Sequence, residues 1–140
     1  MSAIPLRQEA PKTLFLEVTN ADLAIDPFQD RLISQGYEVI TAQTYDEALK
    51  LARSALPALI IVYDDPATNI DAVHWLMLQH CDRIGRLAMI PLLILADVSR
   101  VAELKFEELP DRVVVIQRRA DTLNQLTRTV KRLLRVWELE

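Results

Sequence analysis

The chain has 140 residues, 51% hydrophobic and 26% charged, which is typical of one globular domain that buries about two thirds of its unfolded surface. Two glycines, Gly36 and Gly85, are too few for a glycine-rich phosphate-binding loop, and the net charge of −4 argues against general affinity for nucleic acid. One cysteine, Cys81, allows no internal disulfide, and no signal peptide or membrane-spanning run is evident, so we expect a cytoplasmic protein without membrane contacts.

Short apolar runs alternate along the chain with helical patterns. We expect a flexible tail over residues 1–11, one domain over 12–136, and a tail or linker over 137–140. The expected strands are 14–16, 37–41, 59–63, 90–95 and 113–116. The expected helices are 27–35, 45–55, 70–81, 99–109 and 121–136.

The first two helices carry signals for where they begin and end. Asp26 can cap a helix that starts at Pro27, and Gly36 ends it. Thr44 can cap the second helix. The segment 19–25 is then an unusually long loop or a separate turn of helix.

In two of the helices the apolar spacing predicts which side chains face the core. In the helix over 70–81 these are Val73, Leu76, Met77 and His80. In the last helix they are Leu123, Leu126, Val130, Leu133, Leu134 and Trp137. The other face of the last helix carries Arg128, Lys131, Arg132 and Arg135.

The most informative strand is the run 59–63, which is apolar throughout and is followed by Asp64 and Asp65. Strands of this kind belong to parallel sheets covered by helices on both faces, and ligands gather at the carboxyl ends of such strands. Five strands that alternate with five helices predict a doubly wound, flavodoxin-like α/β sheet in the order 2-1-3-4-5.

Several stretches resemble the receiver domain of two-component response regulators, and the likeness extends over residues 12–135. The stretches that carry it are 36–42 (GYEVITA), 46–49 (DEAL), 57–62 (PALIIV), 90–95 (IPLLIL) and 126–134. All of them are scaffold motifs, so they favour the fold more strongly than the chemistry.

The resemblance implies a phosphorylation site, which this chain matches only in part. A receiver phosphorylates an aspartate after its third strand, binds Mg²⁺ with two acids after the first strand, and adds a hydroxyl after the fourth and a lysine after the fifth. Here the first acid is Glu17, whereas Val18 takes the second position and cannot coordinate a cation. Ala96 takes the hydroxyl position.

The groups expected in and after the fifth strand are also missing. The lysine position falls on Gln117, Arg118 or Arg119, and the aromatic position on Val114, Val115 or Ile116. Loss of the hydroxyl and the lysine removes groups that stabilise a transferred phosphoryl group. We therefore expect a pseudo-receiver, which keeps the scaffold without the phosphorylation chemistry and is not an enzyme.

The phospho-acceptor position is ambiguous by one residue. Counting forward from Pro57 puts Tyr63 there, whereas counting back from residues 69–72 (NIDA) puts Asp64 there. We favour Tyr63 at the structural position, with Asp64 and Asp65 just beyond it in the loop. Because side chains alternate along a strand, Tyr63 and Asp64 cannot point the same way.

Three acids remain as candidate ligands at this end of the sheet. Glu17, Asp64 and Asp65 could bind Mg²⁺ weakly, or the two aspartates could be solvated loop residues. An atypical phospho-accepting regulator would use Asp64 with Glu17 and Asp65 as partial ligands. A small-molecule-binding domain would instead need an apolar, enclosed pocket beside Tyr63.

The remaining candidate is an interaction face. In receivers the fourth helix, the fifth strand and the fifth helix form the usual partner or dimer face. Here the charges on that face would be Glu103, Glu107, Arg128, Lys131, Arg132 and Arg135. Complementary charges could steer a homodimer or an output partner, although each helix alone could be an ordinary solvated face. Recognition of a protein partner, without direct nucleic-acid binding, is the leading functional hypothesis.

Overall fold

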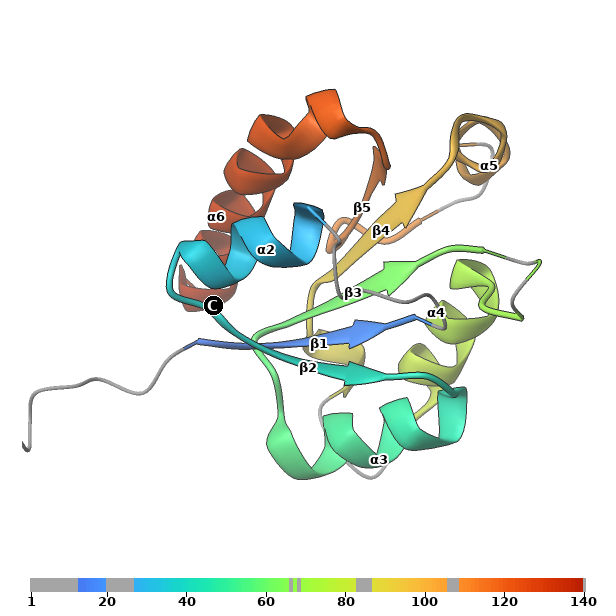
Figure 1. The fold of residues 1–140 in the computed structure, drawn as a ribbon. Coiled ribbons are helices and arrows are strands. Elements are labelled where there is room, and N and C mark those ends of the chain that lie inside the picture. The colour runs from blue at the N-terminus through green and yellow to red at the C-terminus, as the bar shows by residue number, and fades with distance from the viewer. Residues whose placement is uncertain are drawn as a thin grey trace, which may run out of the picture.

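A computed structural model describes residues 13–19, 27–65, 67, 69–82, 87–105 and 109–139. At its centre is a five-stranded parallel sheet in the order β2-β1-β3-β4-β5 (Figure 1). The strands are β1 (Leu14–Val18), β2 (Glu38–Ala42), β3 (Leu59–Tyr63), β4 (Leu92–Ala96) and β5 (Val113–Gln117). The predicted fold class and strand order are confirmed.

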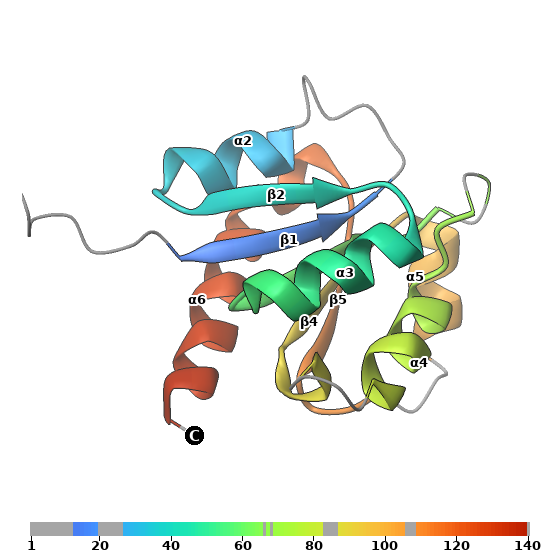
Figure 2. The ribbon, with the colours of Figure 1, turned by 90° about the horizontal axis from the view of Figure 1, so that it is seen from below.

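Helices cover both faces of the sheet, as Figures 1 and 2 show. The helices are α2 (Pro27–Ser34), α3 (Tyr45–Ala55), α4 (Ala72–Cys81), α5 (Val98–Leu104) and α6 (Leu123–Leu139). The helices α2 and α6 pack on one face, and α3, α4 and α5 on the other. The strand β3 is buried on both sides, because Ile61 faces the α2/α6 layer and Ile60 the opposite layer.

The helix boundaries follow the predicted signals where the structure describes them. The Thr44 hydroxyl accepts a hydrogen bond from the Glu47 N–H at 3.1 Å and so caps α3. Gly36 follows α2 with φ +92°, a backbone conformation that favours glycine. The expected cap Asp26 and the segment 20–26 lie outside the described residues.

The predicted core face of α4 is right for Val73 and Leu76, which pack against the core, and wrong for Met77 and His80. Met77 is 62% exposed and His80 is exposed, whereas Trp75 and Gln79 are buried. The Gln79 amide donates hydrogen bonds to the carbonyls of Leu87 and Ile90 at 2.7 and 2.9 Å, and its oxygen accepts one from the Trp75 indole at 2.9 Å. These bonds satisfy the buried Gln79 amide, so this polar side chain lies on the core side of α4, where the apolar spacing predicts Met77.

The last two helices differ from expectation at their ends. The helix α5 begins at Val98 and ends at Leu104, and residues 106–108, with Glu107, lie outside the described residues. A 3₁₀ turn (Ala120–Thr122) precedes α6, which continues to Leu139, so the backbone of 137–139 is helical rather than a tail. The expected tail 1–11 and the Trp137 side chain are not among the described parts.

On the core side of α6, Leu126, Val130 and Leu133 are buried as predicted. Within the described part of the chain, no helix combines the length and the apolar character needed to cross a membrane.

Candidate functional site at the carboxyl end of the sheet

The carboxyl ends of four strands bring polar side chains to one edge of the sheet. Glu17 lies in β1, Asp64 follows β3, Asp97 follows β4 and Arg118 follows β5. Ligands of parallel sheets gather at such an edge. The pairing of β3 with β4 continues to Asp64, whose N–H donates a hydrogen bond to the Leu95 carbonyl at 2.8 Å.

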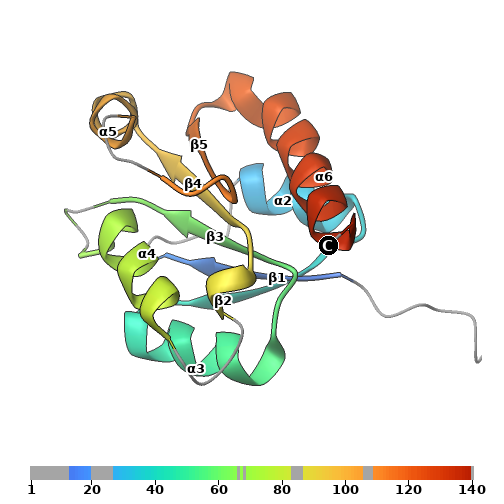
Figure 3. The same cartoon turned by 180° about the vertical axis from the view of Figure 1, so that it is seen from behind.

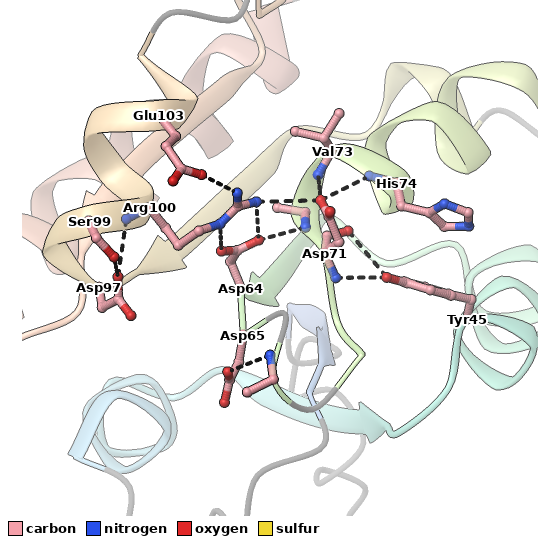
Figure 4. A network of polar contacts seen from close by, with 12 residues as sticks. Tyr45, Asp64, Asp65, Asp71, Val73, His74, Asp97, Ser99, Arg100 and Glu103 are labelled. Carbon is pink, nitrogen blue, oxygen red and sulfur yellow. Dashed lines mark hydrogen bonds and ion pairs between the residues drawn. The ribbon is translucent and has the colours of Figure 1, made fainter.

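The side chain of Asp64 is fully buried and points towards α4 and α5 (Figure 4). Its Oδ2 accepts a hydrogen bond from Arg100 Nε at 2.7 Å. Its Oδ1 accepts from the Ala72 N–H at 2.7 Å and from Arg100 Nη2 at 3.2 Å. Both carboxylate oxygens therefore accept strong, charge-assisted hydrogen bonds from the same arginine.

Arg100 holds this position because α5 begins immediately after β4. The Asp97 carboxylate caps α5, and it accepts hydrogen bonds from the Ser99 hydroxyl at 2.8 Å and the Arg100 N–H at 3.1 Å. These two bonds hold the pKa of Asp97 below its usual value, and the bond from the Ser99 hydroxyl has the larger effect. Arg100 thus lies in the first turn of α5, with its guanidinium over the end of β3 (Figure 4).

The guanidinium of Arg100 is shared among three carboxylates. Besides Asp64, it contacts Glu103 through Nη1 at 2.6 Å and Asp71 through Nη2 at 3.5 Å. The hydrogen bonds to Asp64 are the main reason why the pKa of Arg100 lies above its ordinary value. The arrangement gives Asp64 a permanently charged counter-ion.

The loop between β3 and α4 continues the network. Asp65 and Ile70 pair through two backbone hydrogen bonds at 2.8 and 3.2 Å, and the Asp65 side chain is exposed. The Asp71 carboxylate caps α4. The Tyr45 hydroxyl accepts a hydrogen bond from the Asp71 N–H at 2.7 Å and ties this cap to α3.

Glu17 belongs to the opposite face of the sheet. It is fully buried, and its Oε2 accepts a hydrogen bond from the Tyr63 hydroxyl at 2.5 Å. Its Oε1 accepts from the Gln29 side chain at 2.8 Å. As the alternation along β3 requires, Tyr63 packs in the α2/α6 layer while Asp64 points into the other layer.

The candidate metal ligands are therefore not brought together. Glu17 and Asp64 lie on opposite faces, and the exposed Asp65 bonds the Ala67 N–H at 3.2 Å. Among the described residues no group of three His, Cys, Asp or Glu side chains could hold a metal ion. This donor set does not fit Mg²⁺, which needs several oxygens around one point.

The positions interpreted as degenerate lie at the carboxyl ends of β1 and β4 and just after β5. Val18 and Ala96 are buried in the apolar core beneath α3 and α4. The Arg118 guanidinium lies over the Tyr63 ring, 4.8 Å from its centroid, and Arg119 forms an ion pair with Asp121. Neither arginine forms a described contact with Asp64.

A cavity of about 330 Å³ opens at this edge of the sheet. It is lined by Pro27, Phe28, Asp64, Asp65, Asp97, Arg118 and Arg119. Five of these seven residues are charged, so the cavity is unlike the apolar, enclosed pocket that a small-molecule-binding domain would need.

Sequence reasoning missed Arg100. The contact joins residues 36 positions apart, and nothing in the local pattern of α5 marks its third residue as special. The available signal was the position itself, because Asp97 can cap a helix at the carboxyl end of β4 and so places Arg100 one turn above the sheet edge.

The fold is that of response-regulator receiver domains. No protein-family model and no curated protein sequence matches the chain. Solved structures do match, receiver domains among them, with TM-scores well above 0.5.

Three of these structures illustrate the likeness. A sensor protein from Polaromonas sp. JS666 has a TM-score of 0.73 at 17% identity, covering 91% of this chain and 99% of that one. The receiver domain of a signal transduction histidine kinase from Syntrophus aciditrophicus has a TM-score of 0.70 at 22% identity, covering 87% of this chain and 89% of that one. The chemotaxis response regulator CheY4 of Vibrio cholerae has a TM-score of 0.67 at 19% identity, covering 88% of this chain and 99% of that one. At these identities the likeness establishes the fold.

Proposed function

We propose that this chain is a receiver-like module of a two-component signalling system that does not accept a phosphoryl group and acts by binding another protein. The observation that carries the proposal is the capture of Asp64 by Arg100 and the Ala72 N–H. An acceptor carboxylate must present a free oxygen to the phosphorus in line with the leaving group. Both oxygens of Asp64 are already engaged, and its side chain is fully buried.

The surroundings of Asp64 support the same conclusion. A transferred phosphoryl group needs a metal ion and fixed donors for its oxygens. Val18 offers no ligand, Ala96 no hydroxyl, and Arg118 lies over the Tyr63 ring instead of reaching Asp64. Among the described residues, Arg100 is the one cation that forms an ion pair with this carboxylate.

The interaction role is supported by the ordered surface around β5. The strand β5 is an edge strand of the sheet, flanked by α5 on one face and α6 on the other (Figures 1 and 3). Arg100 holds α5 against β3 and α4 without any modification of the protein. A partner would therefore meet a preformed surface on α5, β5 and α6, which avoids the cost of ordering it on binding.

Intact-mass spectrometry after incubation with Mg²⁺ and acetyl phosphate tests the loss of phosphorylation. The wild-type protein and Asp64→Asn are compared, with circular dichroism showing that both are folded. We expect no phosphoryl adduct on either protein. An adduct on the wild type that disappears in Asp64→Asn would contradict the proposal and identify the chain as an atypical acceptor that uses Asp64.

The variant Arg100→Gln separates two reasons why Asp64 would not accept a phosphoryl group, namely the missing site groups and the ion pair with Arg100. If the missing hydroxyl, lysine and second acid suffice, freeing Asp64 from Arg100 still gives no adduct. An adduct on Arg100→Gln alone would show that the ion pair by itself blocks an otherwise competent site.

A further inference from the structure

The outer face of α6 carries four exposed cations, Arg128, Lys131, Arg132 and Arg135, which we call the basic row. Within the described part of the chain, none of these side chains forms an ion pair or a hydrogen bond. Their spacing of three, four and seven residues places them on one face of the helix. The row is an unpartnered stripe of positive charge on a protein whose net charge is −4.

The row is not explained by the stability of α6. Like charges three or four residues apart repel each other, and the row contains four such pairs and no acid among them. The negative end of the helix dipole favours cations only within the last turn, and Arg128 and Lys131 lie two turns or more before Leu139. The free protein therefore carries a repulsion that an anionic partner would relieve.

The packing of α6 turns the row away from the rest of the molecule. Leu126, Val130 and Leu133 face the sheet and are buried. On the side next to α2, the Asn124 and Thr127 side chains accept hydrogen bonds from Arg31 at 3.2 and 3.4 Å. Asn124 lies one turn before Arg128 on the same side of the helix, so the row begins beside this contact and continues towards Arg135. The four cations themselves form no described contact that a partner would displace.

We propose that the basic row binds the acidic face of a helix in a partner protein. The inference gives the chemistry of the partner in the proposed function, and it rests on the interaction role and not on the loss of phosphorylation. From Arg128 to Arg135 the row spans eight residues, about 10 Å along the helix axis, and carboxylates at the same spacing on a second helix would pair with each cation. The three arginines can each bind a carboxylate through two hydrogen bonds.

Other anionic partners fit these observations less well. The net negative charge of the chain opposes a long polyanion such as DNA, and four cations make a small footprint. A lipid surface would hold the described part of α6 by headgroup charge alone, because its apolar side chains up to Leu134 are packed against the sheet.

The first test uses a defined probe. A fluorescent helical peptide with glutamates at positions i, i+3, i+4 and i+7 is titrated with the full chain. A peptide of the same composition with scrambled glutamates serves as its control. We expect the matched peptide to bind at least about tenfold more tightly, and its binding to weaken as NaCl rises from about 50 to about 300 mM.

Charge reversal then locates the site. The double variant Lys131→Glu/Arg132→Glu should lose at least about tenfold in affinity for the matched peptide. The single change Lys131→Glu should also weaken binding more than the control Lys50→Glu, which changes the net charge equally at an exposed lysine of α3, away from α5, β5 and α6, and should lose less than about threefold. Equal binding of the two peptides, or equal losses in Lys131→Glu and Lys50→Glu, would overturn the proposal.

Two further measurements bear on the partner class and on the repulsion. Tighter binding of duplex DNA or of phosphatidylserine vesicles than of the matched peptide would also overturn the proposal. Lys131→Gln/Arg132→Gln should raise the thermal midpoint of the free protein, whereas a fall would show that the row serves stability. None of these readouts depends on acetyl phosphate, so this inference and the phosphorylation result can fail separately.

Discussion

At the scale of single residues, the central feature is the pair formed by Asp64 and Arg100. The Asp64 side chain is fully buried, and that of Arg100 is 19% exposed. Taking two charges out of water is costly, and good geometry with further hydrogen bonds is needed to offset that cost. The Ala72 N–H and Glu103 supply those further bonds. We therefore expect the pair to be strongly coupled in its effect on stability.

A double-mutant cycle measures that coupling. Arg100→Gln leaves a buried carboxylate without its counter-ion and should lower the free energy of unfolding by about 3 kcal/mol. Adding Asp64→Asn removes the stranded charge, so the double variant should be more stable than the sum of the two single changes predicts. Urea unfolding of the four proteins gives the coupling energy.

Glu103→Gln is the matched control for this cycle, because it also removes a partner of Arg100. Glu103 is 63% exposed, so its pair with Arg100 should be worth about 0.5 kcal/mol. Additive effects of Arg100→Gln and Asp64→Asn would show that the two side chains are not coupled in solution.

The second residue-scale feature is the hydroxyl of Tyr63. In Tyr63→Phe the buried Glu17 carboxylate loses one donor and keeps the Gln29 amide. We expect a loss of about 2 kcal/mol in the free energy of unfolding. The ring remains available to Arg118, so the change isolates the hydroxyl.

Tyr45→Phe gives the comparison, because in the described part of the chain the Tyr45 hydroxyl bonds only backbone atoms of Asp71. This substitution should cost about 1 kcal/mol. A smaller loss in Tyr63→Phe than in Tyr45→Phe would mean that the Glu17 contact contributes little.

At the scale of elements, the cap of α5 controls where Arg100 lies, and its carboxylate titrates. The Ser99 hydroxyl and the Arg100 N–H lower the pKa of Asp97. A lowered pKa means that the contribution of Asp97 to stability is present above its unfolded value, about 3.9, and is lost as the pH falls through the folded value.

Asp97→Asn keeps a capping oxygen and removes the titration. The thermal midpoint of the wild type should therefore fall more steeply below about pH 4 than that of Asp97→Asn. Thermal melts between about pH 2.5 and pH 6 test this, with Asp97→Ala as the variant that loses the cap at every pH. Parallel acid limbs in the wild type and Asp97→Asn would contradict the assignment.

The same scale shows what sequence could and could not predict. The runs that became β3 and β4 are apolar on both faces, so their composition indicated a covered parallel sheet. The alternation of five strands with five helices then predicted the strand order. In α4 seven of the ten residues are apolar, and the core side is decided by the hydrogen bonds of Gln79 to the segment before β4. No periodicity within the helix contains that information.

The candidate site divides in the same way. Its place at the end of β3 could be predicted from position. The lack of a metal ligand at Val18 and of a hydroxyl at Ala96 could be predicted from residue type. The bond between Asp64 and Arg100 could not, because it depends on how α5 packs over the sheet edge. Nor could the separation of Glu17 from Asp64 be predicted while the register of the acceptor position was ambiguous by one residue.

At the scale of the whole molecule, the sheet itself separates the acids that a metal ion would need. Glu17 is bonded to Tyr63 and Gln29 within the α2/α6 layer, and Asp64 is bonded to Arg100 in the layer of α4 and α5. A cation could recruit both only if β1 or β3 turned its side chain to the other face. Such a change shifts the register of every residue in the strand and exposes its core side chains.

We therefore expect Mg²⁺ to leave the stability of the whole protein unchanged. A site with a dissociation constant of about 1 mM would raise the free energy of unfolding by about 1.4 kcal/mol at about 10 mM Mg²⁺, because only the folded state would bind the ion. Urea unfolding with MgCl₂ and with NaCl of equal ionic strength should give the same midpoint within error. Arg100→Gln is the informative comparison, since it frees the oxygens of Asp64. A Mg²⁺-dependent rise in the midpoint of the wild type that vanishes in Asp64→Asn would show that Arg100 gives way to the cation and that the site is a working acidic pocket.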